Sequence, residues 1–381
     1  MNLIVIGRGE DCVDHAMWCK KMGHEVRYIV PEKIGMSVFD DADDIVSFSD
    51  SMQGIVEQLR ISHRLPPRGQ DAVNVLTDKV LFKSHPAVKP FVVQHIEIVP
   101  GTSKETAAAL VNNHISFPVV VKPSNGFYSA GVVRAKTIEE FKRAYMKASR
   151  IGQFLAPRSS PARVIVEKYL DGNEFAVDGF VVGERIHPIL IHRKRPFLEG
   201  PTFHESAYLT EYFDTSLGDM PLRMLEHIIG GLGLRNSAFH AEFRFDANGR
   251  LHVLEVAPRM AGSGATTQQL MAICVGLDAY ECLHALGQKT IDLSPKHRGF
   301  GLEYDFGPNS SGTLGNVAKI ALACENLGAA RIIRYHSDGD VVLGPPNNVE
   351  CILTAFFECK SLEAGEALFD HISNHYSIQT E

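Results

Sequence analysis

Two apolar segments on either side of a strong turn signal place the tightest constraint on how this chain can fold. Residues 238–245 (AFHAEFRF) and 251–256 (LHVLEV) are separated by a turn that contains residues 246–249 (DANG). This pattern predicts an antiparallel hairpin. Glu242 and Glu255, thirteen residues apart, can then lie side by side on one face, although one or both could instead face solvent.

The two glutamates predict a cation site. Two like charges held together cost free energy unless a cation lies between them. Because the ligands would all be oxygens, Mg²⁺ or Mn²⁺ is the expected ion, with phosphates completing the octahedron. Arg259, three residues beyond Val256, could contact the oxygens of a transferred phosphate.

Residues 117–132 (FPVVVKPSNGFYSAGV) have the features of a phosphate-binding loop. An apolar strand leads Lys122 into a loop that contains Gly126, Ser129 and Gly131. Glycines let backbone amides approach phosphate oxygens, and a lysine ammonium neutralises their charge. A purely structural hairpin is the alternative interpretation of the same pattern.

Residues 164–179 (VIVEKYLDGNEFAVDG) predict a strand whose edge faces a nucleotide. The segment through Glu167, Tyr169 and Leu170 offers amide donors and carbonyl acceptors to an adenine ring. Glu174, seven residues after Glu167, could accept hydrogen bonds from ribose hydroxyls. A solvated hairpin is again the alternative.

Charged residues outside these segments are candidates for phosphate and substrate contacts. Lys79, on a predicted helix, would be a second phosphate cation, although a lone lysine is commonly a solvated surface charge. Arg244 lies two residues beyond the first glutamate and should share its strand face. Residues 191–208 read as an irregular functional loop, in which Arg195 could hold a carboxylate or phosphate and Glu205 an α-ammonium. Solvated loop charges are the alternative.

Residues 77 to about 287 resemble the ATP-grasp superfamily of ATP-dependent carboxylate–amine ligases. The resemblance rests on four motifs in the family's order: Asp78-Lys79, the KPxxGxxSxGV loop, the VEKYLxGxEF strand, and the paired glutamates ending in ExxPRxAG. It implies nucleotide phosphates at Lys79 and Lys122, adenine at Glu167, Tyr169 and Leu170, ribose at Glu174, and magnesium at Glu242 and Glu255.

Details of the hairpin resemble one branch of this superfamily. His240-Ala241-Glu242, Ala257 and residues 259–262 (RMAG) look like the L-amino acid ligases, which make dipeptides and related amide antibiotics, dapdiamide-type ligases included. Many family members have an asparagine as a third metal ligand two residues after the second glutamate, where this chain has Ala257. The metal shell would then consist of two glutamates, phosphates and water.

The resemblance implies an α/β fold with α+β elements, the ATP-grasp fold. Its expected parts are a Rossmann-like preATP-grasp domain over residues 1–100, a small lid domain over 101–185, and a large catalytic domain over 186–381 with an α+β extension from about 297. Within this frame the apolar spacing predicts single helices over residues 71–83 and 265–286.

The implied reaction joins a carboxylic acid, either an amino acid or an acyl amino acid, to the amine of an amino acid. An acyl phosphate is the intermediate, and ADP and phosphate are released. Arg259 would stabilise the oxyanion, and His240 would act as a base toward the amine or as a phosphate donor, unless it only packs. The alternatives are an ATP-grasp carboxylase that uses bicarbonate and a non-catalytic ATP-binding protein. An NAD oxidoreductase is disfavoured, because Cys12 replaces the third glycine of the dinucleotide fingerprint.

Composition narrows the class of protein further. The 381 residues are 45% hydrophobic with a net charge of −7, which argues against disorder and against nucleic-acid binding. No apolar run approaches a membrane span, and no signal peptide is evident. Seven scattered cysteines without a CxxC pair, and histidines without an HExxH motif, indicate reduced thiols and no histidine metal site. We therefore expect a cytoplasmic enzyme with small-molecule partners, a carboxylate and an amino acid; whether it forms a homodimer is left open.

Overall fold

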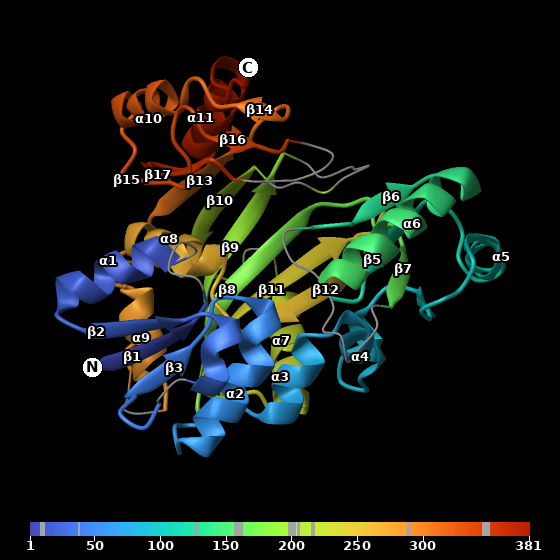
Figure 1. Ribbon diagram of the computed structural model, residues 1–381, viewed down its shortest axis with the longest axis horizontal. Coiled ribbons are helices and arrows are strands. Elements are labelled where there is room, and N and C mark those ends of the chain that lie inside the picture. The colour runs from blue at the N-terminus through green and yellow to red at the C-terminus, as the bar shows by residue number, and fades with distance from the viewer. Residues whose placement is uncertain are drawn as a thin grey trace.

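The computed structural model describes most of the chain. The residues it does not describe are 8–11, 37–38, 126–128, 156–162, 197–202, 204–205, 215–217, 288–290 and 345–350. Three sheets with their helices make up the bulk of the molecule, and Figure 1 shows the four-stranded sheet extending away from the rest. Among the described residues, no helix has both the length and the apolar character needed to cross a membrane.

The N-terminal part is a parallel sheet with strand order β2-β1-β3. Its strands are β1 (Asn2–Ile6), β2 (Glu25–Ile29) and β3 (Asp44–Val46), with helices α1 (Val13–Met22) and α2 (Gln53–Ser62) and the short 3₁₀ helices η2 (Pro31–Met36) and η3 (Asp50–Met52). β1, α1 and β2 form a βαβ unit, as the expected Rossmann-like domain requires. Of Gly7-Arg8-Gly9, which follows β1, only Gly7 lies within the described residues.

Helices α3 (Gln70–Leu76) and α4 (Lys79–Ser84) and the 3₁₀ helix η4 (Lys89–Phe91) lead into an antiparallel sheet of order β4-β7-β5-β6. Its strands are β4 (His95–Ile98), β5 (Val119–Pro123), β6 (Val133–Ala135) and β7 (Val164–Lys168), and its helices are α5 (Lys104–His114) and α6 (Ile138–Leu155). Alternating apolar side chains of these strands, such as Val119, Val121 and Val166, pack against the two helices. This sheet carries the expected phosphate-binding lysine.

The third sheet has eight strands in the order β12-β11-β8-β9-β10-β13-β17-β15. The strands are β8 (Glu174–Val182), β9 (Arg185–Arg195), β10 (Ala207–Tyr212), β11 (Ser237–Phe245), β12 (Leu251–Ala257), β13 (Phe300–Phe306), β15 (Arg331–Arg334) and β17 (Leu353–Cys359). Its helices are α7 (Met220–Leu232), η6 (Gly262–Gly264), α8 (Ala265–Val275), α9 (Ala279–Ala285), α10 (Val317–Asn326) and α11 (Leu362–His375). The pair β14 (Gly312–Thr313) and β16 (Val341–Val342) forms a small separate ladder.

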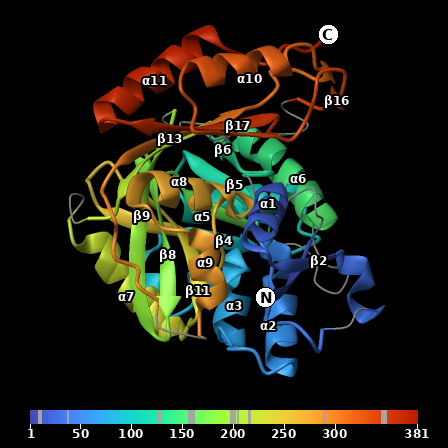
Figure 2. The ribbon, with the colours of Figure 1, turned by 90° about the vertical axis from the view of Figure 1, so that its left-hand side faces the viewer.

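The large sheet is covered on both faces. Phe175, Phe239 and Phe243 pack toward α7 in one cluster, whereas Phe180 and Leu190 belong to a second cluster with α8, α9 and the N-terminal sheet. In Figure 2, α10 and α11 lie over the strands of the C-terminal end, β13 and β17. The C-terminal extension therefore continues the sheet instead of standing apart from it.

Three expected elements differ from those observed. The helix expected over 265–286 is two helices, because Gly276 ends α8 in the left-handed conformation (φ 70°) and Asp278 caps α9. The helix expected over 71–83 is also interrupted, since the Asp78 carboxylate accepts the amides of Val80 and Leu81 and starts α4 anew.

The segment 191–208 was expected to be an irregular loop. It instead begins inside β9 and ends inside β10, which pair antiparallel. Its first residues, 191–195, alternate between the two faces of the sheet, and the charged sequence HRKR hides that period. Residues 197–202 and 204–205 of the segment lie outside the described residues. The domain boundaries near residues 100 and 185 stay predictions. β4, which precedes the boundary near residue 100, pairs with β7. β8, which precedes the boundary near residue 185, belongs to the large sheet.

Candidate active site

The hairpin of β11 and β12 brings the two glutamates side by side. Glu242 is the direct cross-strand partner of Glu255, and a bulge follows Glu242. Partners directly opposite in an antiparallel pair share a face, so the expectation from the thirteen-residue spacing is confirmed. The side chains are 18% and 27% exposed, which leaves both carboxylates open to a ligand.

Two lysines neutralise this carboxylate pair. Lys79 Nζ lies 2.8 Å from Glu255, and Lys194 Nζ lies 2.8 Å from Glu242 and 2.7 Å from Glu174. Burial would raise the pKa of Glu242, but attraction by Lys194 and the hydrogen bond from His240 hold it well below its usual value. Burial would likewise lower the pKa of Lys79, but Glu255 and then Asp50 and Glu242 raise it. Glu242 and Lys79 are therefore charged at neutral pH.

Lys194 was not among the expected site residues. It is 1% exposed and comes from β9, two strands away from β11 in the sheet. The signal that could have found it is strand alternation: His192 and Lys194 are both buried, whereas Arg193 and Arg195 are partly exposed. A lysine at an inward position of a strand needs a carboxylate partner.

On the side of the small sheet, two lysines share one carboxylate. Glu167 lies 2.7 Å from Lys122 and 3.1 Å from Lys83, and Lys83 also donates to Leu254 O at 3.2 Å. Burial would raise the pKa of Glu167, but the attraction of both lysines holds it at about 2. Burial also lowers the pKa of Lys83 to about 8, despite Glu167. Lys83 was missed, although its spacing of four from Lys79 places both on one helix face.

The expected ribose carboxylate lies at the junction of the two sheets. Arg244 donates to Glu174 at 3.1 Å and to Tyr169 Oη at 3.1 Å, and its guanidinium lies 5.1 Å from the Tyr169 ring centroid. These contacts favour a role for Arg244 in orienting Glu174, and they disfavour the expected contact of Arg244 with the substrate. Leu170 is buried. Ser129 has φ 52° in the segment expected to bind phosphate, and Gly126 of that segment lies outside the described residues.

His240 is tied into a buried network below Glu242. Its Nδ1 lies 2.6 Å from Asp178, and its Nε2 lies 3.5 Å from Glu242. Burial would lower the pKa of His240, but Asp178 and then Glu242 raise it to about 10. An imidazolium carries a proton on both ring nitrogens and cannot accept another. The environment of His240 therefore favours a role as a cationic hydrogen-bond donor, and it disfavours the expected role as a base toward the amine.

Arg259 pairs with an acid from the N-terminal part of the chain. Its Nε and Nη2 each donate at 2.7 Å to the two carboxylate oxygens of Asp50, and its Nη1 donates to Met260 O at 3.1 Å. Sequence reasoning had not singled out Asp50, which begins η3.

Of the expected substrate residues in 191–208, Arg195 faces away from this cluster. Its guanidinium pairs with Glu366 of α11, and its Nε donates at 2.8 Å. This pair attaches the C-terminal helix to the large sheet. Glu205 lies outside the described residues, so its expected role stays a prediction.

The carboxylates fit the magnesium ion that the resemblance implies. Glu242 and Glu255 present hard oxygen donors side by side, the ligand type that Mg²⁺ selects. Among the residues that the structure describes, no group of three or more histidines, cysteines or acids could hold a metal. Ala257, opposite His240 in the ladder, offers no side-chain donor, so phosphates and water would supply the other ligands.

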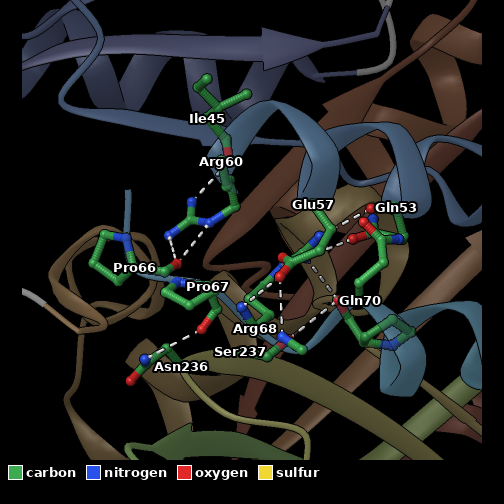
Figure 3. Close-up of polar contacts among 12 residues, drawn as sticks. Ile45, Gln53, Glu57, Arg60, Pro66, Pro67, Arg68, Gln70, Asn236 and Ser237 are labelled. Carbon is green, nitrogen blue, oxygen red and sulfur yellow. Dashed lines mark hydrogen bonds and ion pairs between the residues drawn. The ribbon is translucent and has the colours of Figure 1, made fainter. Parts of the chain in front are cut away.

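A small cavity lies behind Arg259, between the N-terminal part and the large sheet. Its lining includes Ser47, Phe48, Arg60, Arg68 and Met260, and its volume of about 20 Å³ holds about one water molecule. Figure 3 shows that Arg60 donates to the carbonyls of Ile45 and Pro66, and Arg68 to Glu57 and Gln53. Arg68 also donates to Pro258 O at 3.4 Å, a contact that joins the N-terminal part to the segment after β12.

Comparison with known proteins shows which families this chain is similar to. Residues 115–267 match the family model of the ATP-grasp domain. A D-alanine–D-alanine ligase of Francisella tularensis subsp. holarctica is 22% identical over 287 residues, covering 72% of this chain and 87% of that protein.

Two solved structures share the fold over nearly the whole chain. An L-amino acid ligase from Bacillus licheniformis superposes with a TM-score of 0.82 at 18% identity and covers 100% of this chain and 98% of that one. N5-carboxyaminoimidazole synthetase from Staphylococcus aureus, complexed with ADP, has a TM-score of 0.73 at 15% identity, with 97% and 96% covered. The resemblance found in the sequence is thereby confirmed: the chain has the ATP-grasp fold, carries an ATP-grasp domain, and is similar to ATP-dependent carboxylate–amine ligases of that superfamily.

Proposed function

We propose that this protein is an ATP-dependent ligase that joins a carboxylic acid to the amine of an amino acid, through an acyl phosphate, with release of ADP and phosphate. The observation that carries the proposal is the register of Glu242 against Glu255 with Lys79 and Lys194 beside them. Alternating acids and ammonium groups can bind both the phosphates of a nucleotide and the cation that accompanies them.

The first step brings anions together, because a carboxylate attacks the γ-phosphate of ATP. Catalysis of such a step is largely charge neutralisation and positioning. Lys122 from the small sheet and Lys79 from α4 would approach the phosphates from two sides, and both already carry carboxylate partners that a phosphate could replace. Mg²⁺ held by Glu242 and Glu255 would screen the phosphate charge.

Adenosine recognition is assigned to the junction between the sheets. Glu174 is held by Lys194 and Arg244, which fixes its oxygens to accept ribose hydroxyls. The backbone from Glu167 to Leu170 would contact adenine. The negative charge of Glu167, paired with two buried lysines, would fix this strand end.

In the second step an amine attacks the acyl phosphate, and the carbonyl oxygen becomes an oxyanion. Arg259 is the candidate donor to that oxyanion, since preorganised cations stabilise developing negative charge. His240, as a buried imidazolium, would keep Glu242 in place. Closure of the small sheet over the site would exclude water, which hydrolyses acyl phosphates.

A carboxylase is the second candidate, because the chain shares its fold with N5-carboxyaminoimidazole synthetase. Bicarbonate would then be the carboxylate that is phosphorylated. Stimulation of ADP release by bicarbonate alone, with no effect of organic acids, would favour this candidate. A non-catalytic ATP-binding protein, suggested by Ala257, would release no ADP with any acid.

The test measures ADP and phosphate release with ATP and Mg²⁺ across a matrix of organic acids and amino acids, and identifies amide products by mass spectrometry. Glu255→Gln should lower kcat by about 100-fold or more. Glu139→Gln, which removes an exposed partner of Lys142 on α6, is the matched control and should leave kcat unchanged. If no acid–amine pair stimulates ADP release, the ligase proposal fails.

A further inference from the structure

Lys83 is a fully buried lysine that lies beside the expected phosphate lysine Lys122. Its Nζ lies 3.1 Å from Oε1 of Glu167 and donates to Leu254 O at 3.2 Å. The same oxygen of Glu167 lies 2.7 Å from Lys122 Nζ. Because the Lys83 side chain is 0% exposed, it cannot reach a solute directly. Any effect of Lys83 on a ligand must therefore pass through Glu167 and Lys122.

The three charges form a cluster in which one carboxylate serves two ammonium groups. If Lys122 and Glu167 were alone, a phosphate that drew Lys122 away would leave the carboxylate buried without a cation, which is costly. With Lys83 charged, Glu167 keeps a cation while Lys122 turns to a phosphate. The ammonium of Lys83 therefore makes Lys122 available to an anion without touching that anion.

The charge of Lys83 depends on the groups packed around it. Burial disfavours the ammonium most strongly, Glu167 of β7 favours it, Lys122 of β5 opposes it, and Glu255 of β12 favours it more weakly; together they lower the pKa of Lys83 to about 8. On its own helix, Lys79 lies four residues away and is paired with Glu255. Phosphates bound at Lys122 would add negative charge and so favour the ammonium of Lys83. Such coupling is reciprocal, because a group that gains a proton when a ligand binds also strengthens that binding when protonated.

We propose that Lys83 is a positioning residue for nucleotide binding, which retains Glu167 while Lys122 binds the phosphates and takes up a proton from solvent as the nucleotide binds. This inference rests on the proposed ligase function, because that function places the phosphates at Lys122. Lys83 itself contacts neither the nucleotide nor the reacting atoms. The affinity for nucleotide should therefore be highest where Lys83 is charged, and it should fall as the pH rises and the ammonium is lost.

The test measures binding of ADP with Mg²⁺ to the wild-type protein by isothermal titration calorimetry between pH 7 and 9.5. The Kd should rise by about 10-fold across this range, the effect of one nearby ammonium charge, and most of the rise should lie above about pH 8. The phosphates of ADP are fully ionised throughout. At pH 8.5 the binding enthalpy should vary with the ionisation enthalpy of the buffer, which reports proton uptake.

Three variants separate this role from a structural one. Lys83→Arg carries a charge that does not titrate in this range, so its Kd should match the wild-type value at pH 7 and stay constant to pH 9.5. Lys83→Met should have a Kd about 10-fold higher at pH 7, again without pH dependence. Lys104→Met removes an exposed ammonium near Glu105 on α5 and should behave as wild type. A structural role alone would shift Kd by the same factor at every pH.

Several results would overturn the inference. A wild-type Kd that stays constant from pH 7 to 9.5 would do so without any variant, and this arm remains decisive even if a substitution at the buried position prevents folding. A folded Lys83→Met protein that keeps the wild-type rise in Kd would do so as well. In both cases ADP still binds, and the ligase function stands. If ADP does not bind at any pH and no acid–amine pair stimulates ADP release, the proposed function itself fails, and this inference falls with it.

Discussion

At the scale of residues, the site is a set of charges that neutralise one another. Lys194 is the clearest example, since its ammonium contacts Glu174 at 2.7 Å and Glu242 at 2.8 Å while its side chain is 1% exposed. Without it, two largely buried carboxylates would face each other. The same residue therefore links the expected ribose and metal carboxylates, and its charge lowers the pKa of Glu242.

Lys194→Met should destabilise the fold substantially, because it leaves buried carboxylates without their cation. We expect a loss of about 3 kcal/mol or more in the free energy of unfolding, measured by urea titration. Lys142→Met removes an exposed ammonium that pairs with Glu139 three residues away and should change the free energy by less than about 0.5 kcal/mol. Equal effects of the two substitutions would contradict the importance given to the Lys194 contacts.

At the scale of elements, the hairpin of β11 and β12 was predictable and the partners of its side chains were not. The turn at residues 246–249 and the alternation on either side predict the hairpin from local information, and the bulge after Glu242 then places this residue opposite Glu255. Lys194 is 48 residues from Glu242, and Asp50 is 209 residues from Arg259. Only tertiary packing brings such residues together, so sequence spacing could not reveal them.

Helix boundaries illustrate the same limit. Apolar spacing continues from Ala265 to Leu286 and predicts one helix, yet Gly276 adopts φ 70° and separates α8 from α9. Apolar periodicity indicates which side of a helix faces the core. It does not reveal a break when the same side still faces the core after the break. The glycine itself was the local signal that could have placed the break.

Gly276→Ala should therefore be destabilising. A side chain would force a residue other than glycine into the left-handed region, and its Cβ would lie 2.9 Å from His297 Nδ1. We expect a loss of about 1–3 kcal/mol in thermal or urea unfolding. Gly230→Ala, inside α7 with open space around the Cβ, should instead stabilise by up to about 1 kcal/mol. The same sign for both substitutions would contradict this account.

At the scale of the whole molecule, buried polar contacts fix the N-terminal sheet and its helix α1 against α9 of the large sheet. His15 of α1 contacts His284 of α9 at 2.9 Å between their Nε2 atoms, and His284 Nδ1 contacts Asp44 of β3 at 2.7 Å. Burial, and then the neighbouring His284, lower the pKa of His15 from 6.5 to about 3. Such a junction holds Asp50 in place relative to Arg259, and it should weaken in acid.

The sign follows from proton binding in the two states. Between about pH 6.5 and 3, His15 binds a proton when unfolded but not when folded, so this contribution to stability is complete above pH 6.5 and is lost as the pH falls. A single such group changes the free energy of unfolding by up to about 1.4 kcal/mol per pH unit.

His15→Phe keeps an aromatic ring and removes the titrating group. Urea unfolding of both proteins at several pH values between 4 and 7 should give a shallower pH dependence for the variant. Parallel curves would show that His15 does not carry this acid sensitivity.

The central claim is that a carboxylate of the substrate is activated by phosphorylation. The most direct measurement uses an acid labelled with ¹⁸O in its carboxylate, together with ATP, Mg²⁺ and an amino acid, and analyses the products by mass spectrometry. The carboxylate oxygen that attacks the γ-phosphate stays on phosphorus when the amine displaces it. The account predicts ADP, an amide, and one ¹⁸O atom in each released phosphate. Phosphate without ¹⁸O, or the formation of AMP in place of ADP, would contradict it.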